Sequence, residues 1–196
     1  MPRPRRFYEP GTSLHVIHRG HNKMKIFGDD ADFELFLAYL KKSATRHAID
    51  VHAFALMNNH YHLIVTPVDA PSLAAAMKST NGRYVRYFNR KYGRMGTILN
   101  GRFKMIGLHD QVYWLTCLRY VELNPVAAHI VEKPELYSWT SYAQHAFGNA
   151  ASWLSSHRHY DSLGATATER QTAYREMCKY LLTPAELALQ KFTDSR

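Results

Sequence analysis

The feature that most constrains the fold of this chain is a pair of β-rich runs joined by only two residues. Residues 50–57, DVHAFALM, and residues 60–66, HYHLIVT, are rich in β-branched and apolar side chains, as strands are. Asn58 and Asn59 separate them, and asparagine tolerates the positive φ that a tight two-residue turn needs. The pattern therefore predicts an antiparallel pair of strands.

Further periodic segments surround this pair. Residues 14–19, LHVIHR, predict a first strand, and the acidic residues 29 and 30 start a helix that runs to about residue 47. Residues 72–92 predict a long helix, the glycine-interrupted residues 96–108 a bent strand, and Asp110 caps one more helix. The first six elements have the β-α-β-β-α-β order of a ferredoxin-like split βαβ fold. We therefore expect an α+β protein, with an antiparallel sheet that carries helices on one face.

The pattern weakens beyond Pro134, where aromatic residues are scattered among Ser, His and Gly. Helical periodicity returns at about residues 168–182, and Pro184 begins a final short helical segment. We therefore predict two parts: a core domain of residues 1–134 with a basic N-terminal arm, and a partly helical C-terminal appendage of residues 135–196.

The charge of the chain favours a polyanionic partner. Its 196 residues include 25 Lys and Arg against 16 Asp and Glu, a formal net charge of +9. Nucleic acid is the commonest cytoplasmic polyanion, although many plain enzymes are also basic. No run approaches the roughly 18 apolar residues of a membrane helix, and the opening residues lack the apolar segment of a secretory signal. We expect a cytoplasmic protein that makes no membrane contact and contains no disulfide, since only Cys117 and Cys178 are present.

Two groups of arginines are candidates for phosphate contact. One group repeats along one side of the predicted long helix: Arg83, Arg86, Arg90 and Arg94. The other group lies in the N-terminal arm: Arg3, Arg5 and Arg6. Either group contacts DNA backbone or simply forms a solvated, solubilising surface, and composition leaves both interpretations open.

His60 and His62 form the sharpest local motif. Residues i and i+2 of a strand project from the same face, so both imidazoles can reach one ion. Two neutral imidazoles and an oxygen ligand suit Mn²⁺, Zn²⁺ or, less comfortably, Mg²⁺. The alternative is two ordinary hydrogen-bonded histidines, because the chain has 12 of them. By contrast, the spacing of three between His15, His18 and His21 does not keep them on one strand face.

Tyr120 and Asn124 form a second motif in RYVELNPV, four residues apart on one helix face. The asparagine oxygen is a candidate metal ligand and the tyrosine hydroxyl a candidate nucleophile toward a phosphate. Each also has an ordinary explanation, because tyrosine often packs half-buried and Pro125 disfavours helical geometry at Asn124. Tyr113, two turns earlier, is a rival nucleophile.

Together these segments resemble the single-tyrosine HUH transposases, in particular the REP-associated tyrosine transposases of bacteria. The resemblance covers about residues 14–142 and rests on five separated stretches in the order of the family: HVIHRG with FGDDADFELFL, LMNNHYHLIVTP, NGRYVRYFNRKYG, GRFK and LRYVELNPVAAHIV. One departure is that Ala127 and His129 occupy positions where the family usually has arginine and glycine.

The resemblance implies a specific chemistry. It assigns Tyr120 as the nucleophile, and His60, His62 and Asn124 as ligands of a divalent metal ion, Mg²⁺ or Mn²⁺. The tyrosine attacks a phosphodiester of single-stranded DNA, leaving a 5′-phosphotyrosine link and a free 3′-hydroxyl. The DNA targets are hairpins of repetitive extragenic palindromes, whose stem phosphates both arginine groups would contact.

We therefore predict a metal-dependent single-strand DNA endonuclease and strand transferase in the bacterial cytoplasm, associated with the nucleoid. The alternative is a non-catalytic, domesticated protein that binds DNA or RNA hairpins. A third interpretation is a metallohydrolase that activates water, but no Asp or Glu lies between His52 and Asp69 to act as its base. We expect a monomer, with a dimer as the alternative because related insertion-sequence transposases exchange the tyrosine helix.

Overall fold

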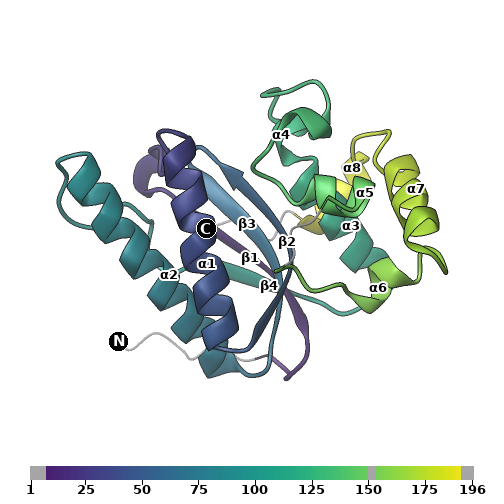
Figure 1. Cartoon of the computed structure of the whole chain (residues 1–196), viewed down its shortest axis with the longest axis horizontal. Coiled ribbons are helices and arrows are strands. Elements are labelled where there is room, and N and C mark those ends of the chain that lie inside the picture. Colours follow the sequence, from purple (N-terminus) through teal and green to yellow (C-terminus); the bar gives the residue numbers. More distant parts are fainter. Residues whose placement is uncertain (1–7, 150–152, 191–196) are drawn as a thin grey trace.

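Four antiparallel strands form one sheet in the order β2-β3-β1-β4 in the computed structural model of the chain, which describes residues 8–149 and 153–190 (Figure 1). The strands are β1 (Ser13–Arg19), β2 (Ile49–Met57), β3 (His60–Pro67) and β4 (Lys104–Leu108). This order and the antiparallel pairing confirm the predicted ferredoxin-like core. The last strand is shorter than predicted, because regular pairing begins only at Lys104.

The predicted hairpin is present, but its turn is built differently from our expectation. β2 and β3 pair up to a two-residue loop, yet neither Asn58 nor Asn59 has a positive φ. The prediction of a positive-φ turn was wrong because the turn is held by tertiary contacts. The carbonyl oxygens of the two asparagines accept backbone N–H groups from the segment after β1, those of Gly20, Ile26 and Phe27.

Two long helices cover the first face of the sheet, as predicted (Figure 1). They are α1 (Asp30–Arg46), whose N-terminus is capped by Asp29, and α2 (Ala70–Lys91), which begins with a capping box between Asp69 and Ser72. Their apolar sides meet those of the strands in one hydrophobic cluster, which includes a group of touching aromatic rings: Phe27, Phe36, Tyr61, Tyr84 and Phe88.

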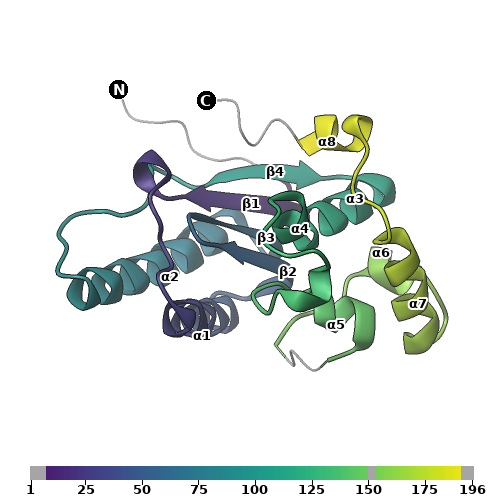
Figure 2. The same cartoon turned by 90° about the horizontal axis from the view of Figure 1, so that it is seen from above.

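The second face of the sheet is covered by α3 (Gln111–Glu122), which begins at its predicted cap Asp110. Trp114, Leu115 and Leu118 of α3 belong to the same hydrophobic cluster as Ile64 in the middle of the sheet. The short elements that follow gather around α3 (Figure 2). They are α4 (Asn124–Ala127), η2 (Pro134–Leu136), α5 (Tyr142–Phe147), α6 (Arg158–Asp161), α7 (Ala167–Met177) and α8 (Pro184–Gln190).

Residues after position 134 pair with the edge strand β2 and contribute to both hydrophobic clusters. The backbone N–H of Leu56 donates to Trp139 O at 2.9 Å, and Thr140 forms a bridge with Ala55 on the edge of β2. Tyr142 and Tyr174 lie in the same hydrophobic cluster as α3. The parts that we predicted as core and appendage therefore share one hydrophobic cluster, and the boundary between residues 134 and 135 stays a prediction.

Two predicted helices end earlier than expected. α2 stops at Lys91, and Gly93, with φ of +60°, follows its C-cap. Arg94 therefore lies beyond the helix, so the predicted four-arginine repeat on one helix side was wrong at its last member. The late helix spans Ala167–Met177 rather than residues 168–182. In the described ranges, no helix combines the length and apolarity that a membrane crossing requires.

Candidate active site

β3 brings the two histidines of the HxH motif together at the start of the strand. The ring centroids of His60 and His62 are 5.0 Å apart, with the rings at 81° to each other. His62 is 1% exposed. Both the pairing register and the alternation along the strand direct His62 to the second face of the sheet, where α3 lies.

The end of α3 places Tyr120 against His62. Their ring centroids are 5.5 Å apart in an edge-to-face arrangement. Tyr113, the rival nucleophile, packs against the hydrophobic cluster between α3 and the second face of the sheet, as Tyr120 does. Its pKa is raised by burial and by the nearby Cys117 and Asp110. Tyr120 therefore brings its ring against the HxH motif.

Asn124 reaches the same place although the helix breaks before it. α3 ends at Glu122, and the one-turn helix α4 begins at Asn124, with Pro125 in its first turn where no backbone donor is needed. The Asn124 amide nitrogen lies 3.5 Å from His62 Nε2. The structure thus brings together the four residues predicted for the site, and all four belong to one chain.

His15 of β1 is a further member that our sequence analysis set aside. Its Nε2 lies 2.9 Å from His62 Nδ1, and its ring centroid is 5.8 Å from that of Tyr120. His15 is fully buried, and burial lowers its pKa to about 4. The pKa of His62 also lies well below its ordinary value, through burial and then the neighbouring His60 and His15. The buried pair is therefore neutral at physiological pH.

One assignment of the ring protons satisfies these hydrogen bonds. An amide nitrogen only donates, so the contact with Asn124 makes His62 Nε2 an acceptor and puts the proton on His62 Nδ1. That proton is then donated to His15 Nε2. The Nδ1 of His60 lies 2.6 Å from Asn59 Oδ1, an oxygen that only accepts, so the proton of His60 is also on Nδ1. We call His15, His60, His62, Tyr120 and Asn124 the site cluster.

This donor set fits a divalent metal ion. Neutral imidazoles with their Nδ1 protons held by neighbours present Nε2 as the ligand atom, which is the usual arrangement around protein-bound metals. Across residues 8–149 and 153–190 no group of three or more His, Cys, Asp or Glu is placed to hold a metal. The set therefore depends on His60, His62 and the amide group of Asn124, which offers an oxygen as its other terminal atom.

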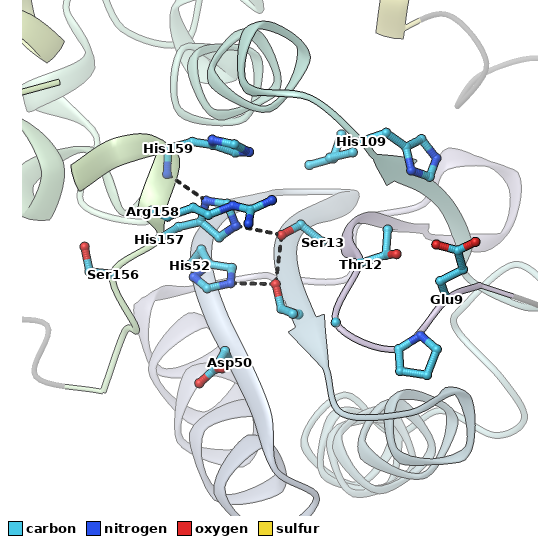
Figure 3. A pocket seen from close by; sticks show the side chains of 14 residues that line it. Glu9, Thr12, Ser13, Asp50, His52, His109, Ser156, His157, Arg158 and His159 are labelled. Atoms are coloured by element: carbon cyan, nitrogen blue, oxygen red, sulfur yellow. Dashed lines mark hydrogen bonds between the residues drawn. The ribbon is translucent and has the colours of Figure 1, made fainter. Parts of the chain in front are cut away.

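A second group of histidines lies at the other end of the same sheet face, around a cavity of about 470 Å³ (Figure 3). We call it the Trp114 cluster, because the indole stacks on the ring of His157 at 4.3 Å and 10°. Its histidines come from β2 and from the start of α6. The members are Ser13, His52, Thr66, Trp114, His157 and His159.

Hydrogen bonds run through the Trp114 cluster in one direction (Figure 3). His52 Nδ1 donates to the carbonyl of Ser155 at 2.9 Å, so its Nε2 accepts from the Thr66 hydroxyl at 2.8 Å. Thr66 accepts from Ser13 at 2.8 Å, and Ser13 accepts from His157 Nε2 at 3.1 Å. His157 Nδ1 accepts a hydrogen bond from the backbone N–H of His159 at 3.2 Å. Both histidines are neutral in this chain of bonds.

α2, which carries Arg83, Arg86 and Arg90, and α3, which carries Tyr120, cover opposite faces of the sheet (Figure 1). Arg86 and Arg90 are exposed, and Arg83 is half-buried. Arg94, past the end of the helix, is exposed and its guanidinium lies 3.7 Å from the sulfur of Met24. The predicted contacts from Arg3, Arg5 and Arg6 lie outside the described residues.

Comparisons with known proteins give a family and a fold. Residues 10–124, more than half of the chain, match the family described as "Transposase IS200 like". The structure of a REP-associated tyrosine transposase bound to a REP hairpin superposes with a TM-score of 0.60 at 15% identity, over 80% of this chain and 93% of that chain. That likeness shows a shared fold.

Two further structures superpose with lower scores. A candidate transposase of Deinococcus radiodurans R1 has a TM-score of 0.41 at 17% identity, over 57% of this chain and 89% of the other. The tRNA(His) guanylyltransferase of Saccharomyces cerevisiae has a TM-score of 0.48 at 10% identity, over 91% and 82%. No curated protein sequence matches the chain.

The antiparallel core and the family match define an enzyme of the transposase class that processes DNA. The chain belongs to the IS200-like transposase family. This confirms the resemblance, the fold class and the enzyme class predicted from the sequence.

Proposed function

We propose that this protein is a metal-dependent single-strand DNA endonuclease and strand transferase that acts through a 5′-phosphotyrosine intermediate. The observation that carries the proposal is the contact of the Tyr120 ring, at 5.5 Å, with His62, whose Nε2 faces Asn124. A nucleophile, two imidazoles and an amide thus meet at one point of one chain. Phosphoryl transfer to a tyrosine requires such a meeting of nucleophile and electrophilic assistance.

His60, His62 and Asn124 are the residues that would hold the metal ion. When bound there, a divalent ion polarises an oxygen of the scissile phosphate and stabilises the charge that develops on it. His15 and Asn59 keep the proton on Nδ1 of His62 and of His60, respectively. Nε2 of each imidazole is then unprotonated and is the atom that would bind the metal. Burial of His62 keeps it neutral and available as a ligand at physiological pH.

Tyr120 performs the covalent step. Its phenolic oxygen forms a bond to the phosphorus while the bond from phosphorus to the 3′ oxygen of the preceding nucleotide breaks. The phenol loses its proton and the leaving oxygen ends as a 3′-hydroxyl, so the numbers of phosphoester bonds and protons are conserved. Attack by that hydroxyl, or by another, on the phosphotyrosine reverses the step and joins strands, without a nucleotide triphosphate.

We propose hairpin-forming single-stranded DNA as the substrate. The superposed REP-associated transposase is described as bound to a REP hairpin, and this chain has a net charge of +9. Phosphate contacts from basic side chains supply sequence-independent affinity for such DNA. The residues proposed to contact the stem backbone are Arg3, Arg5, Arg6, Arg83, Arg86, Arg90 and Arg94.

We further propose that the working unit is a monomer in the bacterial cytoplasm, associated with the nucleoid. Tyr120 reaches His62 of its own chain, so no second chain is needed to complete the site. Exchange of α3 between two chains would have to break the contacts of this helix with its own sheet.

Incubation with labelled hairpin DNA from the flanks of its own gene tests the proposal. With Mn²⁺ or Mg²⁺ present, we expect a covalent protein–DNA band on a denaturing gel. The band should vanish in Tyr120→Phe and persist in Tyr113→Phe, a matched loss of one hydroxyl from the same helix. Binding without any adduct would instead support the hairpin-binding alternative. Cleavage that survives Tyr120→Phe would indicate a metal-activated water.

Salt dependence of DNA binding tests the arginines separately. Each lost phosphate contact lowers the slope of log affinity against log salt concentration by about 1. We expect this decrease for Arg86→Ala and Arg90→Ala, measured by fluorescence anisotropy. Lys41→Ala, an exposed cation on α1, is the matched control. Equal slopes in all variants would show that α2 does not contact the DNA backbone.

A further inference from the structure

The end of α3 carries a carboxylate that the proposed chemistry does not use. Glu122 is 0% exposed. Its Oε1 accepts hydrogen bonds from the hydroxyl of Ser141 and from His145 Nδ1, the latter at 2.7 Å. Its Oε2 accepts one from the hydroxyl of Tyr174 at 2.6 Å. All three donors lie after residue 134, in or next to α5 and α7.

These donors are themselves fixed to the rest of the molecule. The Ser141 hydroxyl accepts the backbone N–H of Phe54 in β2 at 2.9 Å, and the Ser141 N–H donates to Phe54 O at 3.0 Å. The Tyr160 hydroxyl donates to the carbonyl of His145 at 2.7 Å. The carboxylate therefore links α3 to β2, to α5 and, through Tyr174, to α7.

A buried carboxylate is costly unless its oxygens are hydrogen-bonded, and here both oxygens are. These hydrogen bonds also fix the rotation of the end of α3 about its own axis. Successive residues turn by about 100° around an α-helix, so Glu122 projects from nearly the opposite side of α3 to Tyr120. When the C-terminal region holds the helix face that carries Glu122, the opposite face, which carries Tyr120, is therefore held toward His62.

We propose that Glu122 is a positioning residue for the nucleophile. Its bonds to Ser141, His145 and Tyr174 set the rotation of the end of α3, and this rotation holds Tyr120 and Asn124 against His62. The C-terminal region thereby becomes part of the catalytic apparatus of its own chain. The catalytic consequence rests on the proposed function, whereas the positional consequence does not.

The catalytic test compares rates with DNA affinities. In Glu122→Ala we expect the rate of adduct formation at saturating hairpin DNA and Mn²⁺ to fall by about 100-fold, as misplacement by about 1 Å does. The DNA dissociation constant should change by less than about threefold, because the arginines proposed to bind the stem lie elsewhere. Glu122→Gln, which keeps the shape and an accepting oxygen, should recover much of the rate. Tyr174→Phe should lose less than Glu122→Ala, since one bond of three is removed.

The matched control separates positioning from stability. Leu182→Ala removes a buried side chain of the same hydrophobic cluster without touching the Glu122 bonds. We compare the decrease in melting temperature and the decrease in the rate of adduct formation. If Leu182→Ala lowers both as much as Glu122→Gln or Tyr174→Phe does, the positioning role is overturned. The same holds if Glu122→Ala and Tyr174→Phe, each shown by circular dichroism to keep the fold, cleave at the wild-type rate.

A spectroscopic readout tests position without DNA or metal. Fluorine NMR of 3-fluorotyrosine at position 120 should show a shifted or broadened line in Glu122→Gln and Tyr174→Phe. A label at Tyr39 on α1, behind the other face of the sheet, should stay unchanged. An unchanged line at position 120 would overturn the proposal. If the wild type forms no adduct, the proposed function fails, and this measurement still decides the role of Glu122.

Discussion

The site cluster and the Trp114 cluster occupy the same face of the same sheet, and both combine buried with half-buried histidines, yet their hydrogen bonding differs. In the Trp114 cluster both nitrogens of His52 and of His157 have hydrogen-bond partners at 2.8 to 3.2 Å. In the site cluster His62 Nε2 lies 3.5 Å from the amide nitrogen of Asn124. The Trp114 cluster uses its lone pairs in short internal bonds, whereas we propose that the site cluster offers the lone pair of His62 Nε2 to a metal ion.

The aromatic neighbours reinforce this difference. Trp114 lies flat on His157 at 4.3 Å, an arrangement that contributes packing. Tyr120 meets His62 edge to face and brings a hydroxyl-bearing side chain to the imidazole. A count of histidines therefore does not distinguish the two clusters, but the hydrogen bonding of their ring nitrogens does.

Replacing one histidine in each cluster by alanine gives the largest expected difference in the rate of adduct formation. His62→Ala removes a proposed metal ligand, and we expect adduct formation to fall by about 10³-fold, equivalent to several kcal/mol of transition-state stabilisation. His157→Ala should keep the rate within about threefold once folded. Adduct gels at saturating Mn²⁺ measure both. Comparable losses in the two variants would mean that the clusters act as one site.

His15 tests how far the site cluster depends on its buried partner. His15→Phe keeps a ring of similar size but removes the nitrogen 2.9 Å from His62 Nδ1. Loss of such a partner typically lowers metal affinity by about 10- to 100-fold, and we expect that decrease for Mn²⁺ by electron paramagnetic resonance titration. His18→Phe is the control, because this buried histidine contacts Tyr61 and Gly101 on the opposite face. Unaltered Mn²⁺ affinity in His15→Phe would contradict the assigned tautomers.

The elements that the sequence predicted best are those with short-range signals. Alternation and the two-residue loop predicted β2 and β3, and the i, i+2 spacing placed His60 beside His62. Helical spacing also placed Tyr120 and Asn124 on one side, even though α3 ends at Glu122 and Asn124 begins α4. These relations depend on neighbours along the chain, which a sequence shows directly.

The features that the sequence did not reveal depend on pairing between distant segments. His15 meets His62 only because β1 pairs with β3 so that Ile17 lies opposite His62. The spacing of His15 from other histidines in its own segment carries no sign of this. The turn at Asn58 and Asn59 likewise depends on carbonyl bonds to the segment after β1. The periodicity after Pro134 is weak, so it did not predict that Ser141, His145 and Tyr174 all donate hydrogen bonds to the carboxylate of Glu122.

The smallest effect that we expect concerns stability of the Trp114 cluster and its dependence on pH. Burial, with the charges of His52, His159 and Arg158, lowers the pKa of His157 to about 4, while Asp161 acts in the opposite direction. As the pH falls, His157 of the unfolded chain is therefore protonated near pH 6.5, whereas in the folded chain it is protonated only near pH 4.

His157 consequently contributes stability that is complete above about pH 6.5 and is lost as the pH falls toward 4. In His157→Phe the ring still stacks on Trp114 but two hydrogen bonds disappear, so the free energy of unfolding at pH 7.5 should fall by about 1 to 3 kcal/mol. The loss relative to wild type should shrink on acidification, because the variant lacks one of the groups that must be protonated. Urea unfolding between pH 4.5 and 7.5 measures both quantities, with the exposed His21→Phe as control. A difference that stays constant or grows toward low pH would show that His157 is not held neutral by the Trp114 cluster, and the contrast between the two clusters would then rest on geometry alone.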